Sequence, residues 1–174
     1  MRSTTTRNLI FTALCIAIGL LLPQLVKVVP VAYPGAVLLP MHIPVLVCGF
    51  LCGWRYGAVS GIITPMLASL LTGMPPLFPN AVSMMFELAA YGLLTGLLYK
   101  LTNRKIFLTL IGAMLGGRIV LGLVNALLFS IANNVYGLAI FISGAFITAL
   151  PGIIIQLILV PIIIRSLERA KLIL

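Results

Sequence analysis

Apolar segments long enough to cross a membrane follow one another along almost the whole chain. A transmembrane helix needs about 20 apolar residues, and six segments approach that length between short polar breaks. These segments are residues 8–26, 36–53, 57–71, 80–101, 106–132 and 137–164. Only 7% of the residues are charged, whereas a soluble domain carries about 25%. We therefore expect an all-α integral membrane protein, in which residues 1–174 form one compact bundle of six transmembrane helices.

The basic residues predict how the chain is oriented in the membrane. The net charge is +9, and with a cytoplasmic N-terminus nine of the eleven basic residues fall in cytoplasmic segments. These nine are Arg2, Arg7, Arg55, Lys100, Arg104, Lys105, Arg165, Arg169 and Lys171. Cytoplasmic loops are enriched in Lys and Arg, so we expect both termini to be cytoplasmic. Because these residues form short clusters and no continuous basic face, the charge does not indicate nucleic-acid binding.

The outer connections expected from this orientation include residues 27–35 and 72–79, which are rich in Pro and Gly. They are longer than the inner connections. Long loops on a rigid scaffold often carry function, so we expect a binding site that opens outward. Met74 and Phe78 in the second loop are candidate site residues. Asn80 is a residue type that caps helix N-termini, and it is the predicted start of the next helix.

Three ionisable residues stand out because they lie well inside the predicted spans: His42, Glu87 and Arg118. Such residues are costly in a bilayer and usually face the protein interior or a cavity. At about 1.5 Å per residue, His42 and Glu87 lie roughly 9–10 Å from the outer ends of their helices, and Arg118 lies roughly 18 Å from the inner end. We expect the three side chains to converge, with Glu87 as the partner of Arg118.

Two interpretations of this cluster stay open. Arg118 and Glu87 form either a purely structural salt bridge or a site in which Arg118 also meets a substrate carboxylate. His42 is either a packing residue or a ligand contact, and the same holds for Asn125, which shares a helix face with Arg118. Further candidate residues are Tyr91, close to the helix face of Glu87, and Asn133, at the outer end of the helix that carries Arg118.

The sequence offers little for catalysis or for metal binding. It has two acidic residues and one histidine, and no set of nucleophile, base and orienting group. Cys15, Cys48 and Cys52 lie in apolar runs, and no further ligands complete a metal site. There is no nucleotide-binding motif. We therefore expect a protein that is not an enzyme, holds no cofactor or metal, and cannot power transport by itself.

Ala13 and Ala17 are four residues apart in the first segment. Small residues at this spacing allow a second helix to approach closely in lipid.

Together with these features, three stretches of sequence indicate a family. They are Leu39-Pro-Met-His-Ile-Pro-Val-Leu-Val-Cys-Gly-Phe-Leu-Cys-Gly-Trp-Arg-Tyr-Gly57, Thr72-Gly-Met-Pro-Pro76 and Phe86-Glu-Leu-Ala-Ala-Tyr-Gly92. Over almost its whole length the chain resembles the S components of energy-coupling-factor (ECF) transporters, which are prokaryotic importers of vitamins and metal ions. The resemblance implies a six-helix bundle in the plasma membrane, with a substrate site near its outer surface and loop 72–79 as a lid.

The resemblance also implies partners. In this family the alanine face on the first helix, here Ala13 and Ala17, docks onto a transmembrane coupling protein. Two cytoplasmic ATPases use ATP to drive substrate release. The Met41-to-Val45 stretch is closest to subfamilies associated with pantothenate-like vitamins, and pyridoxine and cobalamin are the alternative substrates. A different hypothesis is a self-sufficient small membrane transporter or channel with Glu87 as its ion or proton site.

Overall fold

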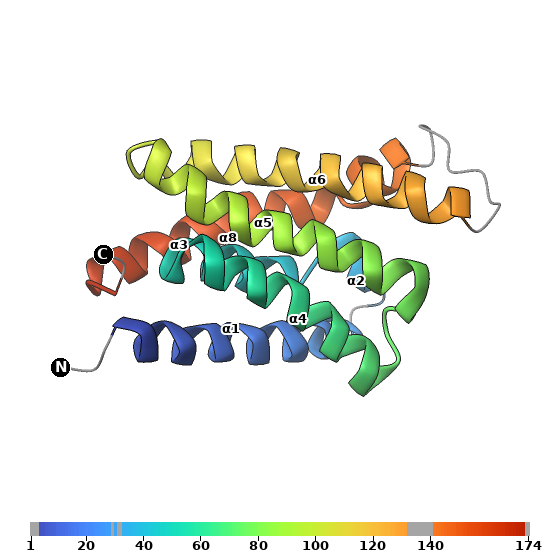
Figure 1. The fold of residues 1–174 in the computed structure, drawn as a ribbon, viewed down its shortest axis with the longest axis horizontal. Coiled ribbons are helices and arrows are strands. Elements are labelled where there is room, and N and C mark those ends of the chain that lie inside the picture. Colours follow the sequence, from blue (N-terminus) through green and yellow to red (C-terminus); the bar gives the residue numbers. More distant parts are fainter. Residues whose placement is uncertain (1–3, 29, 31–32, 132–140, 173–174) are drawn as a thin grey trace.

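The computed structural model describes residues 4–28, 30, 33–131 and 141–172, and all the regular structure in this part of the chain is helical. Figure 1 shows long helices lying side by side along one axis. In chain order, the elements are α1 (Thr4–Val26), α2 (Pro34–Leu38), α3 (His42–Cys52), α4 (Trp54–Thr72), the π-helical turn η1 (Leu77–Ala81), α5 (Val82–Leu101), α6 (Ile106–Ile131), η2 (Ser143–Thr148) and α8 (Leu150–Arg169).

Five stretches of described helix are long and apolar enough to cross a membrane, and this confirms a multi-helix membrane protein. They are Thr4–Val26, Pro34–Cys52, Leu77–Leu101, Ile106–Ser130 and Leu150–Arg169. The predicted span over residues 57–71 is not among them. It forms part of α4, a helix of 19 residues that begins with Trp54, Arg55 and Tyr56 and is therefore less apolar than the others.

Two predicted helix boundaries were wrong, and one predicted span contains a break. The span predicted over residues 36–53 is present as Pro34–Cys52 but is divided into α2 and α3, where Leu39 adopts a left-handed conformation (φ 49°) and Pro40 follows it. Asn80 does not start a helix; it lies inside η1, which runs directly into α5. The last helix was predicted to end at residue 164 but continues to Arg169.

Helix α3 is the centre of the bundle, since ten of its eleven residues are buried. Helices α4 and α5 pack closely through glycines: a Cβ on Gly92 would clash with the backbone of Gly57, and one on Gly61 would clash with the backbone of Leu88. Small residues at such contacts let two helix backbones approach in lipid. This packing fixes the position of α5, the helix that carries Glu87.

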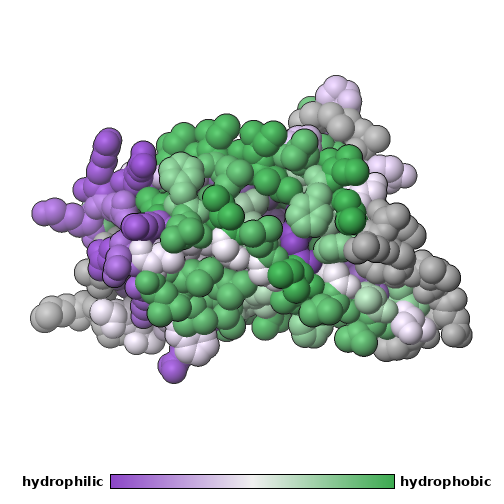
Figure 2. Space-filling model, turned by 90° about the horizontal axis from the view of Figure 1, so that it is seen from above, coloured by the Kyte–Doolittle hydropathy of each residue, from purple (hydrophilic) through white to green (hydrophobic). Residues whose placement is uncertain are grey.

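One end of the bundle is basic. The start of α1 and the end of α8 lie at the same end in Figure 1, together with the turn between α5 and α6. Figure 2 shows hydrophilic side chains gathered at this end and hydrophobic side chains covering the middle of the visible face. Such a separation is the pattern expected of a bundle whose middle lies in hydrocarbon and whose charged end lies at a membrane surface.

Candidate functional site

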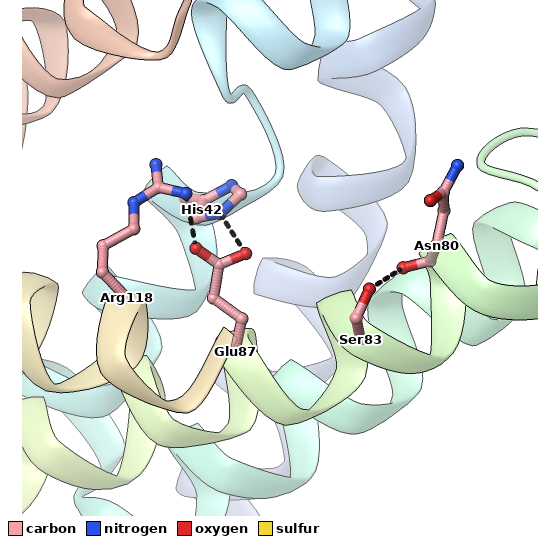
Figure 3. A network of polar contacts seen from close by, with 5 residues as sticks. All are labelled: His42, Asn80, Ser83, Glu87 and Arg118. Atoms are coloured by element: carbon pink, nitrogen blue, oxygen red, sulfur yellow. Dashed lines mark hydrogen bonds and ion pairs between the residues drawn. The ribbon is translucent and has the colours of Figure 1, made fainter. Parts of the chain in front are cut away.

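Three buried side chains from three helices meet inside the bundle, as the sequence predicted. Glu87 on α5 lies between Arg118 on α6 and His42 in the first turn of α3 (Figure 3). Its Oε1 is 2.8 Å from Nη1 of Arg118, and its Oε2 is 3.4 Å from Nε2 of His42. The exposed fractions are only 1% for His42, 2% for Glu87 and 5% for Arg118. Both oxygens of the only acid in the bundle interior are thus occupied by cationic or potentially cationic partners.

The guanidinium of Arg118 is only partly used by this ion pair. Glu87 faces Nη1, whereas Nε and Nη2 are buried and have no hydrogen-bond partner among the described residues. In Figure 3 these two nitrogens lie on the side of the guanidinium that faces away from Glu87. Two parallel N–H groups on one edge of a guanidinium match the two oxygens of a carboxylate. Buried donors are normally paired, so the free edge is a candidate ligand contact.

Tyr91 lies one turn after Glu87 on α5 and completes the wall of the site. Its ring is fully buried and contacts the ring of His42 edge-on, with 5.3 Å between the ring centroids. A Cβ on Gly117 would collide with the Tyr91 ring. The glycine before Arg118 therefore makes room for this tyrosine, and Gly122 likewise lies against Phe141. Both glycines accommodate neighbouring side chains.

Gln156 on α8 is a buried polar residue that the sequence interpretation missed. It is fully buried, and neither its Oε1 nor its Nε2 has a hydrogen-bond partner in the described part of the chain. One turn before it, Gly152 packs against the backbone of α2 at Val37 and Leu38. One turn after it, Val160 belongs to the hydrophobic cluster that also contains Ile43 of α3. Gly152, Gln156 and Val160 share one face of α8, so Gln156 lies in the bundle interior about one turn beyond the contact of α8 with the end of α2.

A signal for Gln156 was present in the sequence. It is the one amide side chain in a long apolar run that begins at residue 150. Several buried hydroxyl groups behave differently, because they bond to the preceding turn of the same helix. Thr64 Oγ1 donates to the Ser60 carbonyl at 2.7 Å, for example, and Thr12 donates to the Asn8 carbonyl at 2.7 Å. A glutamine without such a local partner is a candidate for ligand contact.

An open apolar cavity of 260 Å³ lies beside Arg118, between α6 and the last part of the chain. Apart from Arg118, its wall is made of hydrophobic residues: Ile111, Met114, Leu115, Phe146, Leu150, Ile153 and Leu157. Ile111, Leu115 and Leu150 are about half exposed, so this hollow opens on the apolar outer face of the bundle. Most ligand pockets combine an apolar wall with a few polar anchors in this manner.

The remaining predicted site residues lie away from this cluster or outside the described structure. Met74 and Phe78 are on the surface near the turn into α5, with 58% and 53% of their area exposed. Asn125 is half-buried on α6, two turns beyond Arg118. Asn133 lies outside the described residues. In the described part of the chain, no three His, Cys, Asp or Glu side chains are grouped as metal ligands.

Ala13 and Ala17 lie on the outer face of α1. Both are exposed, whereas Thr12, Cys15 and Gly19 are the buried residues of the same helix. The small-residue face is therefore open to a helix from another protein.

Comparison with known families gives one match. The family model described as "ECF transporter, substrate-specific component" matches residues 7–164. Comparisons with curated proteins and with solved structures gave no significant match. The family match covers every helix that contributes to the buried cluster, and it includes Ala13 and Ala17.

Proposed function

Because the chain belongs to the family of substrate-specific (S) components of ECF transporters, we propose that the cluster of His42, Glu87, Tyr91 and Arg118 is its substrate site. The family is one of substrate-binding membrane subunits of an importer and not of enzymes. Our best candidate for the substrate is pantothenate, and pyridoxine and cobalamin are the alternatives among water-soluble vitamins.

The free edge of Arg118 is the observation on which this proposal depends. A purely structural salt bridge would need only Nη1, and it would leave two buried N–H groups without partners at a cost of about 1–3 kcal/mol each. A substrate carboxylate would satisfy both of them with charge-assisted hydrogen bonds. Glu87 stays paired with Arg118 and His42 in this arrangement. Glu87 is therefore poorly suited to the alternative role of an independent proton site.

The chemistry of pantothenate fits the groups around Arg118. Its carboxylate matches the guanidinium edge, and its amide and hydroxyl groups match the unpartnered Nδ1 of His42 and the amide of Gln156. Its two methyl groups match the hydrophobic cavity beside Arg118. The loop that contains Met74 and the start of η1 with Phe78 would then act as a lid over the outer end, and Asn125 and Asn133 would contribute from α6 and beyond.

For the orientation, we propose that the basic end of the bundle faces the cytoplasm of a prokaryotic cell, so that both termini are inside. The substrate is then captured at the outer face. The exposed Ala13 and Ala17 face docks onto the transmembrane coupling protein, and two cytoplasmic ATPases power release. A cysteine at Met74 should react with an impermeant thiol reagent in intact cells, against a low background because Cys15, Cys48 and Cys52 are buried. Reaction only after permeabilisation would contradict this orientation.

The test of the substrate proposal starts with mass spectrometry of small molecules that co-purify with the lone chain. We expect a carboxylate-bearing vitamin, bound without ATP. The matched variant is Arg118→Lys, which keeps the positive charge and the pairing with Glu87 but removes the two-pronged edge. The affinity measured by calorimetry should fall at least tenfold while the chain stays folded. An unchanged affinity in Arg118→Lys would show that Arg118 is structural only.

A further inference from the structure

A second cavity, of 460 Å³, lies at the basic end of the bundle, far along the helices from the substrate cluster. It is formed by the first turns of α1, the last turn of α3, the last turns of α5 and the turn that follows α5. We call it the basic cleft. Its lining residues are Thr4, Arg7, Asn8, Gly49, Phe50, Leu51, Cys52, Gly53, Gly96, Tyr99, Lys100, Asn103 and Arg104.

Three cations from separate parts of the fold line the basic cleft, and none of its lining residues is acidic. The whole chain has only two acidic residues. Glu87 is committed to Arg118 in the bundle interior. Glu168 is the only other acid, and its carboxylate accepts the hydrogen bond of the Tyr99 hydroxyl at the edge of the cleft. One carboxylate cannot neutralise three cations, so the basic cleft keeps a net positive charge.

The turn that carries Asn103 and Arg104 into the basic cleft has an unusual backbone. Asn103 and Arg104 both have left-handed backbone conformations, with φ of 51° and 63°, which are uncommon outside glycine. Their turn is closed by a hydrogen bond of 3.0 Å from the Arg104 amide to the Tyr99 carbonyl. Across the cleft, the Nε of Arg7 is buried and has no hydrogen-bond partner among the described residues. Arg7 and this turn line the same cleft.

We propose that the basic cleft binds the phosphate headgroup of an anionic phospholipid, such as phosphatidylglycerol or cardiolipin. The cleft lies where α1 begins and α5 ends, which is the depth of the headgroups for helices that span the membrane. Basic pockets between transmembrane helices on the cytoplasmic side bind such headgroups. Phe50 and Leu51 add apolar wall, and Leu9 and Ile10 expose hydrophobic surface on α1 close by. A phospholipid, unlike free phosphate, can contact both the cations and the apolar wall of the basic cleft.

The bound headgroup would connect two helices that are otherwise held apart. Helix α1 packs mainly on α3 and α4, whereas the basic cleft separates Arg7 of α1 from Lys100 and Arg104 at the end of α5. A phosphate between them would join these cations. Because α1 also presents Ala13 and Ala17, the lipid would hold the start of the docking helix in place. The inference does not depend on the identity of the substrate.

The test compares two triple variants of the full-length chain in neutral detergent. The first, Arg7→Gln with Lys100→Gln and Arg104→Gln, removes the cations of the basic cleft. The control, Lys105→Gln with Arg169→Gln and Lys171→Gln, removes three exposed cations of the same end that do not line the cleft. Lipid binding is measured by native mass spectrometry during titration with phosphatidylglycerol, and with phosphatidylcholine as the neutral reference.

We expect the parent chain and the control to bind phosphatidylglycerol in preference to phosphatidylcholine. Each lost cation should weaken binding about fivefold, so the cleft variant should bind at least tenfold more weakly. Equal losses in both triple variants would overturn the proposal in favour of a general surface charge effect. Displacement of the lipid by inorganic phosphate at similar concentration would overturn the choice of a lipid.

The single variants Arg104→Gln and Lys105→Gln give a second comparison if the triple variant does not fold. These neighbours are both exposed, and only Arg104 lines the basic cleft. We expect Arg104→Gln alone to lose about fivefold in affinity for phosphatidylglycerol. An equal effect of the two single variants would also contradict a specific site.

Discussion

Arginine occurs in two contrasting settings in this protein. In the bundle interior, Arg118 is 5% exposed and paired with Glu87 at 2.8 Å. At the basic end, Arg104 is exposed and takes part in neither of the two ion pairs found among the described residues. Hydrocarbon cannot stabilise a charge, so an interior arginine requires a partner from the protein. At the basic end of the bundle, water and lipid headgroups can stabilise the charge of an arginine. The same residue type is therefore costly to disturb in one region and nearly neutral in the other.

The largest expected effect is that of Arg118→Ala, which leaves the buried carboxylate of Glu87 with His42 as its only partner. Breaking a buried ion pair costs about 3–5 kcal/mol in the free energy of unfolding. Thermal unfolding of the ligand-free chain in detergent measures this loss, and substrate binding should disappear as well. Arg104→Ala is the matched control from the basic end and should cost less than about 0.5 kcal/mol.

The double variant Arg118→Ala with Glu87→Ala separates folding from binding. Removal of both charges should restore most of the stability, since no uncompensated charge is left in the interior. Substrate binding should stay lost, because the guanidinium edge is absent. A double variant that binds the vitamin as tightly as the parent would show that Arg118 acts only as a structural partner of Glu87.

A smaller effect, of opposite sign, is expected for Gln156→Leu. Leucine has a similar volume and leaves no unsatisfied amide, so the ligand-free chain should become about 1–2 kcal/mol more stable. If Gln156 contacts substrate, the affinity should fall at least tenfold in the same variant. Thermal unfolding and calorimetry on one preparation give both values. A variant that loses stability would show that the amide already has a partner inside the bundle.

The interior charges were predictable because the bilayer admits few ways to place them. His42, Glu87 and Arg118 are the charged or chargeable side chains that lie deepest in the predicted spans, so the cost of burying charge predicted that they would meet. A neutral polar residue in a predicted span is a weaker indication of a binding site than a charged residue is. Gln156 costs less in lipid than a charge does, and whether its amide bonds locally or points to a ligand depends on packing that the sequence does not show.

The helix boundaries show a similar limit. Apolar length predicted where helices run, but it did not predict the break after α2 at Leu39. Pro40 disfavours the helical conformation of the residue before it, but the left-handed backbone that Leu39 adopts depends on the surrounding packing. This break places His42 in the first turn of α3, next to Glu87, so a local backbone detail determines the geometry of the site. The close packing of α4 and α5 through Gly57, Gly61 and Gly92 also depends on which faces meet.

A still smaller effect is expected at the basic end. Lys105→Gln removes an exposed charge that has no ion-pair partner among the described residues. The free energy of unfolding in detergent without added lipid should change by less than about 0.5 kcal/mol. Chemical denaturation of the purified variant measures this change. A loss of more than about 1 kcal/mol would mean that the basic end also depends on specific pairing, and it would remove the contrast with Arg118.

The smallest effect on the lone chain is expected for Ala13→Trp. Its side chain lies on the exposed face of α1, opposite the buried Thr12 and Cys15, so the indole should extend into detergent or lipid without disturbing the bundle. Unfolding and vitamin binding should match the parent, whereas co-purification with the coupling protein should fail because the helices can no longer approach closely. Leu14→Trp is the control on the neighbouring exposed position and should assemble more readily. Normal assembly and uptake by Ala13→Trp and by Ala17→Trp would show that this face is ordinary lipid-facing surface.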